Sequence, residues 1–188
     1  MPRMTRSPVS VIDTKISPEL VQHILQSIND NDIVPHRQGT IMGKQTNKRM
    51  RDCLTAGIPT TYWFAGMIWH HIERVNQHNF QLDITSFGND VIQLMRYEPG
   101  GHYKWHVDDQ YFTDKPHVRK LSFSLLLNDS YEGGEIQFYL QGNKSIQTIP
   151  KQIGQLVIFD SRVVHRVLPV KSGMREALVG WVVGPQWR

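Results

Sequence analysis

RKLSFSLLLNDSYEGGEIQFYL, residues 119–140, reads as two strands joined by a turn. The first strand ends at Asn128 and Asp129, and the pair Gly133 and Gly134 opens the second, because glycine reaches positive φ freely. From residue 82 onward the apolar residues become β-branched and aromatic, and turn signals recur. This pattern predicts a run of short strands in the second half of the chain.

Further strands are predicted on both sides of this stretch. They are the segments 90–109, with a Pro-Gly-Gly turn inside it, 144–149, 154–170 and 175–184. Many short strands separated by turns are typical of a compact β-barrel or sandwich of the jelly-roll type.

Two helices are predicted upstream of the strands. Segment 17–30 has Ser17 as a cap and Pro18 in its first turn, and segment 60–80 also places its apolar residues at helical spacing. Between them, residues 31–59 look like loop with short extended pieces. We therefore predict an α+β protein with one domain over 1–188, in which helices of an N-terminal support region (1–84) pack on one sheet of a β core (85–188).

Composition limits the classes of protein that fit. The 188 residues carry a net charge of +4 and are 39% hydrophobic, so a buried core is expected and disorder is not. Cys53 is the single cysteine, which excludes an intramolecular disulfide and a cysteine-based zinc site. No run approaches 18 apolar residues, so we expect no membrane segment and a cytoplasmic protein. The basic run 43–51 indicates a solvated loop rather than a nucleic-acid site.

The sequence KWHVDD, residues 104–109, suggests part of a metal site. Side chains at i and i+2 of a strand share a face, so His106 and Asp108 can point at one ion while Asp109 faces the other way. We assign Asp109 to turn hydrogen bonding or to the support of the ligands. His-x-Asp alone is a weak signal, because chance occurrences are common.

Candidates for a third metal ligand and for an anion-binding residue lie further along the chain. His165 lies in an apolar strand, and Arg175 follows ten residues later at the start of the next strand. Two histidines and one carboxylate form the facial triad of non-haem Fe(II) oxygenases, which leaves three positions open on the ion. A guanidinium grips carboxylates with two parallel hydrogen bonds, so Arg175 suits the far carboxylate of 2-oxoglutarate.

The segments RYEPGGHYKWHVDD, RKLSFSLLLNDSYEGGEIQFY and GQLVIFDSRVVHRVLPVKSGMREALVGW closely resemble the prolyl-4-hydroxylase-like 2-oxoglutarate/Fe(II) dioxygenases. The resemblance is nearest to the PKHD-type hydroxylases of bacteria and phages and is specific over residues 91–182. It implies a double-stranded β-helix (jelly-roll, cupin-like) core. By motif it also implies iron ligation by His106, Asp108 and His165, and a 2-oxoglutarate anchor at Arg175.

The resemblance also implies roles for other side chains. Tyr97 matches a tyrosine beside the cosubstrate, and Tyr103 matches a second pocket tyrosine. Trp181 matches a pocket tryptophan, and Arg119 is placed to contact substrate at the mouth of the site. Residues 108–120 look like a mobile lid.

One departure concerns the strand 121–128. The animal oxygen-sensing prolyl hydroxylases carry a tyrosine there that reaches the 2-oxoglutarate tail. In this chain Leu125, Leu126 and Leu127 fill that stretch. Arg175 therefore needs another hydroxyl donor beside it, and the substrate preference of the animal enzymes does not transfer.

The resemblance implies a prolyl 4-hydroxylase of proteins or peptides, of the procollagen-proline type. It would couple oxidative decarboxylation of 2-oxoglutarate to succinate with C–H hydroxylation, using Fe(II) and O2 with support from ascorbate. An alternative is a hydroxylase of a free amino acid or small metabolite. A nucleic-acid demethylase fits less well, because MREALVGW lacks the second arginine of such enzymes. A non-enzymatic jelly-roll binding protein or zinc cupin would not need Arg175. The oligomeric state is left open.

Overall fold

The computed structural model describes residues 7–31, 33–34, 37–40, 45–109, 116–140, 142 and 144–187. Two helices precede most of the strands, as predicted: α1 (Pro18–Asn29) and α2 (Trp63–Val75), the latter continuing into a π-helical turn, η2 (Asn76–Phe80). Ser17 caps α1 by accepting a hydrogen bond from the Leu20 N–H. Neither α1 nor α2 has the length and apolar content needed to span a bilayer, and the same holds for every other described helix.

The larger sheet has eight strands in the order β1-β12-β8-β15-β6-β4-β2, with β5 also paired to β15. Its strands are β1 (Val9–Asp13), β2 (Arg37–Gln38), β4 (Leu54–Pro59), β5 (Ser86–Phe87), β6 (Val91–Tyr97), β8 (His117–Leu126), β12 (Gln155–Asp160) and β15 (Arg175–Pro185). Every pairing in it is antiparallel, and β8 and β15 form its centre.

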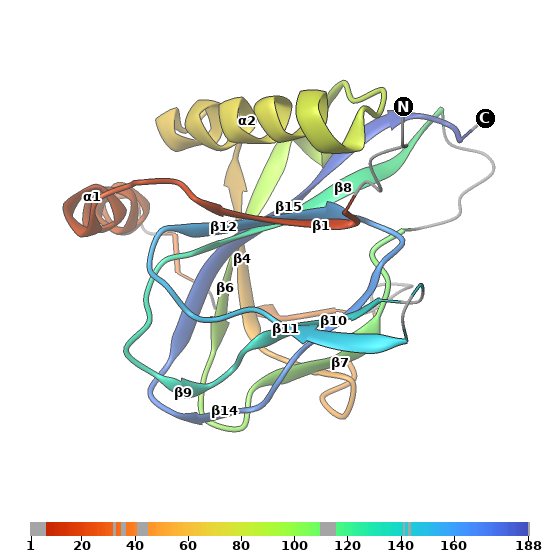
Figure 1. Ribbon diagram of the computed structural model, residues 1–188. Helices are drawn as coiled ribbons and strands as arrows, with labels where there is room; N and C mark the ends of the chain where they lie inside the picture. Colours follow the sequence, from red (N-terminus) through yellow and green to blue (C-terminus); the bar gives the residue numbers. More distant parts are fainter. Residues whose placement is uncertain are drawn as a thin grey trace.

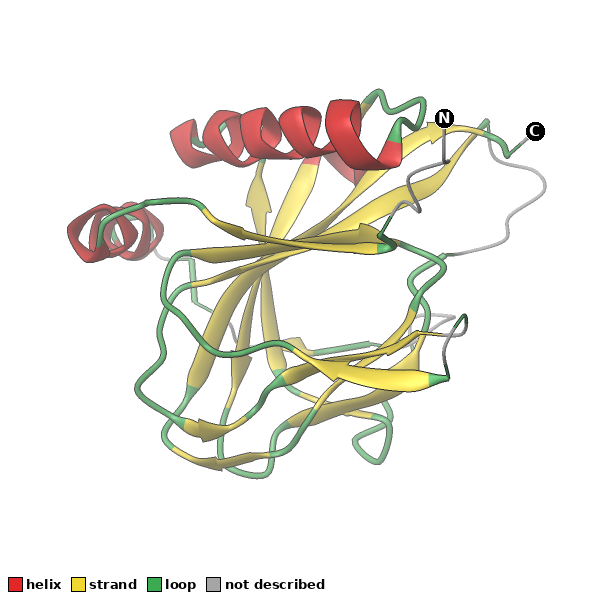
Figure 2. Ribbon diagram, in the orientation of Figure 1, coloured by secondary structure: helices red, strands yellow, loops and turns green. Residues whose placement is uncertain are grey.

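The smaller sheet has five strands in the order β11-β10-β13-β7-β3. They are β3 (Arg51–Asp52), β7 (His102–His106), β10 (Ile136–Leu140), β11 (Ser145–Thr148) and β13 (Val164–Val167). A two-stranded ribbon, β9 (Glu132–Gly133) with β14 (Val170–Ser172), and a 3-10 turn, η3 (Gly88–Asp90), complete the elements. The two sheets face each other, and the helices cover only the outer face of the larger one (Figures 1 and 2).

This arrangement is the double-stranded β-helix of the jelly-roll class, and it confirms the α+β fold with helices packed on one sheet. The main apolar core lies between the helices and the larger sheet. It joins Ile24 of α1 and Ile68 of α2 to Phe123 of β8 and Leu178 of β15, all at most 2% exposed. The opposite face of the same strands looks into the space between the sheets.

Two predictions about strands are corrected. Segment 154–170 was expected to be one strand, but it forms β12, β13 and β14, which belong to three different sheets. The chain turns at 161–163, where the Val163 N–H bonds to the Asp160 carbonyl. The N-terminal region also supplies β1, which the sequence analysis did not predict, besides the short extended pieces expected within 31–59.

Candidate active site

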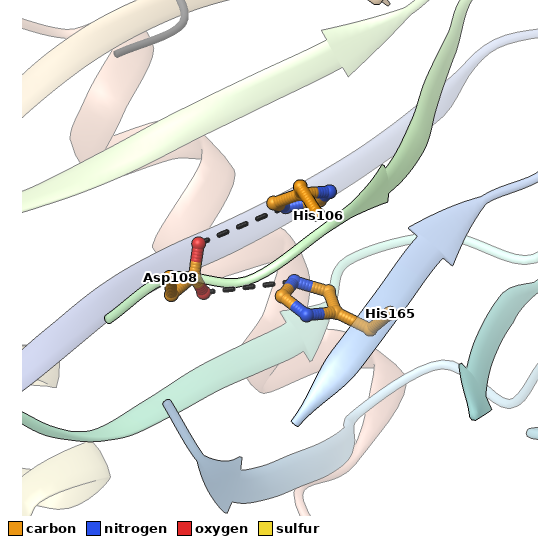
Figure 3. A group of neighbouring side chains, drawn as sticks. All are labelled: His106, Asp108 and His165. Carbon is orange, nitrogen blue, oxygen red and sulfur yellow. Dashed lines mark ion pairs between the residues drawn. The ribbon is translucent and has the colours of Figure 1, made fainter. Parts of the chain in front are cut away.

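His106 and His165 lie side by side because β7 and β13 are adjacent in the smaller sheet and place these two residues opposite each other. Asp108 follows the end of β7, so its position comes from a loop. The backbone N–H groups of Asp108 and Asp109 both donate to the Ser161 carbonyl, at 3.0 and 2.8 Å. The loop therefore turns the Asp108 carboxylate toward both imidazoles (Figure 3).

The three predicted metal ligands come together. Asp108 Oδ1 lies 3.7 Å from His106 Nε2, and Asp108 Oδ2 lies 3.6 Å from His165 Nε2 (Figure 3). One donor atom from each residue lies within 4.8 Å of the others. Two imidazoles and a carboxylate at this spacing fit a divalent ion such as Fe(II) and leave other coordination positions open.

Hydrogen bonds orient both imidazoles for ligation. His106 Nδ1 lies 2.7 Å from the Lys104 carbonyl, and His165 Nδ1 lies 3.0 Å from the Val163 carbonyl. Each Nδ1 must carry the proton to make these bonds, which leaves each Nε2 with a free lone pair toward Asp108. The backbone thus selects the tautomer that a metal needs.

Electrostatics also favours the forms of these side chains that bind metals. Burial, together with the neighbouring His165, lowers the pKa of His106 to about 3, so its imidazole is neutral. Burial acts to raise the pKa of Asp108, but His165, His106 and a hydrogen bond from Ser122 outweigh it and lower that pKa. A neutral imidazole and an ionised carboxylate are the ligand forms that bind a divalent ion.

Aromatic rings fix the histidines from both sides. The Tyr103 ring stacks on His106 with 3.4 Å between ring centres, and Phe159 packs on His165 at 4.6 Å. Behind Tyr103 lies the buried Arg51, whose guanidinium carbon is 4.9 Å from the centre of that ring. Tyr103 thus lies against His106, whereas Arg51 was not identified from the sequence.

Two buried serines support Asp108 from behind. Ser122 on β8 hydrogen bonds with the Asp108 carboxylate, and its Oγ lies 2.9 Å from Ser161 Oγ. Ser161 also holds the loop through its carbonyl, as described above. Both serines are at most 1% exposed, so water does not compete for these bonds. The alternation of residues along β8 was the available signal for Ser122, because Leu121 and Phe123 point to the helices.

Arg175 starts β15 and is 4% exposed. Its Cζ lies 5.4 Å from the centre of the Tyr97 ring, and the two residues pair across β15 and β6. Its Nη2 donates to Ser124 Oγ at 3.5 Å, and Arg175 acts to lower the pKa of Tyr131, which lines the same cavity. Leu126 on β8 packs in an apolar cluster with Tyr131, which lies outside β8. A tyrosine from another segment therefore lies near the Arg175 guanidinium.

Arg119 and Trp181 are in contact with each other. The Arg119 guanidinium carbon lies 3.7 Å from the centre of the Trp181 ring, and Nη1 donates to the Asp108 carbonyl at 3.1 Å. Both side chains line a cavity of about 290 Å3, which also includes His117 and the turn 86–90. The pair therefore connects this cavity to the loop that carries Asp108.

Two further predictions near the candidate metal ligands concern Asp109 and the expected lid. Asp109 is 4% exposed, and neither carboxylate oxygen has a hydrogen-bond partner in the described part of the chain. Turn hydrogen bonding by that carboxylate is therefore not observed; its backbone N–H makes the bond instead. Residues 110–115 of the expected lid lie outside the described residues.

Sequence comparison defines the class of this domain. Residues 92–183 match the family described as the 2OG-Fe(II) oxygenase superfamily, and they include the clustered His106, Asp108 and His165 as well as Arg175. Residues 92–183 thus resemble a 2OG-Fe(II) oxygenase domain. The cofactors expected from the sequence, Fe(II) with 2-oxoglutarate and O2 as cosubstrates, are those of the superfamily.

The curated relatives that the chain matches include PKHD-type hydroxylases. The chain is 44% identical over 94 residues to a PKHD-type hydroxylase of Synechococcus sp. (strain CC9902), covering 48% of this chain and 40% of that protein. It is 34% identical over 117 residues to a PKHD-type hydroxylase of Synechococcus elongatus, covering 59% and 52%. The chain thus spans about half the length of the curated relatives it matches.

Solved structures share the fold over nearly the whole chain. A Pseudomonas putida prolyl-4-hydroxylase superposes with a TM-score of 0.71 at 22% identity, covering 97% of this chain and 95% of that one. A prolyl hydroxylase from Trichoplax adhaerens, solved with a peptide fragment of the hypoxia-inducible factor, gives 0.76 at 20% identity, covering 93% and 83%. At these identities the likeness supports the double-stranded β-helix fold and nothing finer.

Proposed function

We propose that this protein is an Fe(II)- and 2-oxoglutarate-dependent oxygenase in which His106, Asp108 and His165 hold the metal. The observation that carries the proposal is the meeting of these three side chains, from two strands and a loop, within 4.8 Å. Their Nε2 atoms and carboxylate face one another, while backbone carbonyls occupy the Nδ1 atoms. In this proposal residues 1–188 act as a single catalytic domain.

Arg175 is proposed to bind the far carboxylate of 2-oxoglutarate, with Tyr97 beside the cosubstrate. A buried guanidinium with no carboxylate bound to it among the described side chains is costly, and an anionic ligand would offset that cost. Bound Fe(II) and 2-oxoglutarate supply the oxidation that couples decarboxylation to hydroxylation of a substrate C–H bond. The protein's own residues orient both groups and keep water out of the pocket.

The proposed substrate is a prolyl residue of a protein or peptide. Three observations support it: the names of the relatives, the peptide held by the Trichoplax structure, and the cavity beside Arg119 and Trp181. A cavity of about 290 Å3 with an indole in its wall suits a small ring such as that of proline. Arg119 is placed to donate to a substrate carbonyl, and Tyr103 lies beside the metal ligands.

The test uses metal-stripped protein supplied with Fe(II), ascorbate and 2-oxoglutarate. Succinate is measured with and without a library of proline-rich peptides, and mass spectrometry locates any added oxygen. We expect succinate to rise with a hydroxylated prolyl peptide. His165→Ala should abolish both signals, whereas His23→Ala, an exposed histidine on α1, should not.

Two other outcomes have clear meanings. Succinate formation without any oxidised peptide would retain the oxygenase and contradict the peptide substrate, so that free amino acids would be assayed next. Absence of iron-dependent turnover in folded protein with every substrate would contradict the oxygenase itself.

A further inference from the structure

We propose that Tyr131 and Ser124 complete the anion site around Arg175, so that the far carboxylate of 2-oxoglutarate binds one guanidinium and two hydroxyl groups. This inference rests on the proposed function. It assigns the hydroxyl donor that the leucines of β8 cannot supply, and it places that donor on the segment between β8 and β9.

The three side chains meet in one small cavity. Ser124, Tyr131 and Arg175 all line it, together with Gly134 and Lys151. The cavity holds about 20 Å3 of space for the centres of water molecules. One ordered water needs roughly 10–15 Å3 by this measure, so there is room for about two oxygen atoms, as in a carboxylate.

Both hydroxyl groups beside Arg175 can donate a hydrogen bond to an anion. A guanidinium only donates, so Ser124 Oγ accepts from Arg175, and Arg175 also acts on the pKa of the Tyr131 hydroxyl that lines the same cavity. Each hydroxyl keeps its own hydrogen as a possible donor. An anion bound to Arg175 would accept both, since ionised acceptors form the stronger hydrogen bonds.

The surroundings hold Tyr131 in place before any ligand binds. Lys151 Nζ donates to the Tyr131 backbone carbonyl and lies 4.6 Å from the centre of its ring. The ring itself is 6% exposed and packs on Leu126 and Ala177. Burial raises the pKa of the Tyr131 hydroxyl, so it stays a protonated donor. Lys151 also brings a second positive charge to the cavity.

Glycine geometry lets the segment approach Arg175 closely. Gly134 has φ +67°, and a Cβ on it would lie 3.3 Å from Arg175 Cδ. Gly133 has φ +70°, and a Cβ there would collide with the Pro169 carbonyl. The glycine pair thus serves the pocket as well as the turn.

The experiment measures ligand binding rather than turnover. Protein loaded with Mn(II), which air does not oxidise as it does Fe(II), is titrated calorimetrically with 2-oxoglutarate and with 2-oxobutyrate, which lacks the far carboxylate. Tyr131→Phe keeps the ring and removes only the hydroxyl. Tyr62→Phe, at a half-buried tyrosine before α2 and outside this cavity, is the matched control.

We expect Tyr131→Phe to weaken 2-oxoglutarate about tenfold or more, the usual cost of losing a hydrogen bond to a charged group. Binding of 2-oxobutyrate and of Mn(II) should stay unchanged, and Ser124→Ala should act in the same sense. Unchanged 2-oxoglutarate binding in Tyr131→Phe, with Arg175→Lys still impaired, would overturn this inference and leave the proposed function standing. An equal loss for both oxo acids would also overturn it, because Tyr131 would then act through the fold. Failure of the wild type to bind 2-oxoglutarate would instead overturn the proposed function.

Discussion

The two faces of β8 differ in chemistry although they share one backbone. Leu121, Phe123 and Leu125 point outward under the helices and are at most 2% exposed. Ser122 and Ser124 point the other way, where one supports Asp108 and the other touches Arg175. Side chains alternate along β8 with a period of two residues. One set therefore packs the sheet against the helices, and the other set lies at the candidate active site.

The same division continues on β15. Leu178 and Val182 belong to the core beneath the helices, whereas Arg175 and Trp181 look into the space between the sheets. Substitutions on the face toward the helices should therefore change stability with little effect on ligand binding. Substitutions on the face between the sheets should change ligand binding with little effect on stability.

The largest effect on stability is expected from Phe123→Ala. Removing a buried phenylalanine leaves a cavity and should lower the free energy of unfolding by about 3–5 kcal/mol, measured by urea denaturation. Trp63→Ala, at a residue 49% exposed, should cost under roughly 1 kcal/mol. A Phe123→Ala protein that keeps its stability but loses Mn(II) binding would break the separation of the two faces.

Ser122→Ala should act in the opposite way. Removing the hydroxyl that supports Asp108 should weaken Fe(II) or Mn(II) binding about 10- to 100-fold, in line with other groups that orient metal ligands. The exposed Ser172→Ala on β14 should bind metal like the wild type. Equal metal affinity for both variants, measured by calorimetry, would mean that the Ser122 bond does not orient Asp108.

Metal-free protein should lose stability as the pH falls. The pKa of His106 is about 3 in the folded state, below the ordinary value near 6.5, so the unfolded state binds more protons between these values. The lowered pKa of Asp108 acts in the same sense at the acidic end. Urea denaturation from pH 7 to 4 should show this fall, and His106→Ala should flatten it. An unchanged slope in His106→Ala would contradict burial of a neutral imidazole.

The smallest effect is expected at the cavity lined by Arg119 and Trp181. Trp181→Phe removes most of the stacking on Arg119 and should raise the KM for a peptide substrate about two- to tenfold. The affinity for 2-oxoglutarate should not change, because Trp181 lies away from Arg175 along β15. A selective loss of 2-oxoglutarate affinity would show that the cavity and the cosubstrate pocket are one site.

The sequence predicted most residues of the candidate site, although the reason given for choosing Asp108 was incomplete. Alternation along a strand pointed to Asp108, yet β7 ends at His106, and the Ser161 carbonyl sets the position of Asp108. The spacing of histidine, aspartate and arginine was informative because it joins three parts of the fold that must meet for the chemistry.

Other features depend on contacts that spacing cannot reveal. The split of 154–170 was hidden because its turn at 161–163 has neither glycine nor proline, and the flanking residues are apolar on both sides. Tyr131 lies close in sequence to Gly133, but its approach to Arg175 follows from the pairing of β9 with β14. Strand pairing of this kind depends on long-range contacts and leaves no local pattern in the sequence.

We expect the inner face to carry a metal held by His106, Asp108 and His165. Pulsed electron paramagnetic resonance of Mn(II)-loaded protein tests it directly, because it counts the imidazole nitrogens bound to the ion. We expect one Mn(II) per chain with two such nitrogens, and one nitrogen with much weaker binding in His165→Ala. Mn(II) that shows no nitrogen couplings, or the same couplings in His106→Ala and His165→Ala as in the wild type, would contradict it.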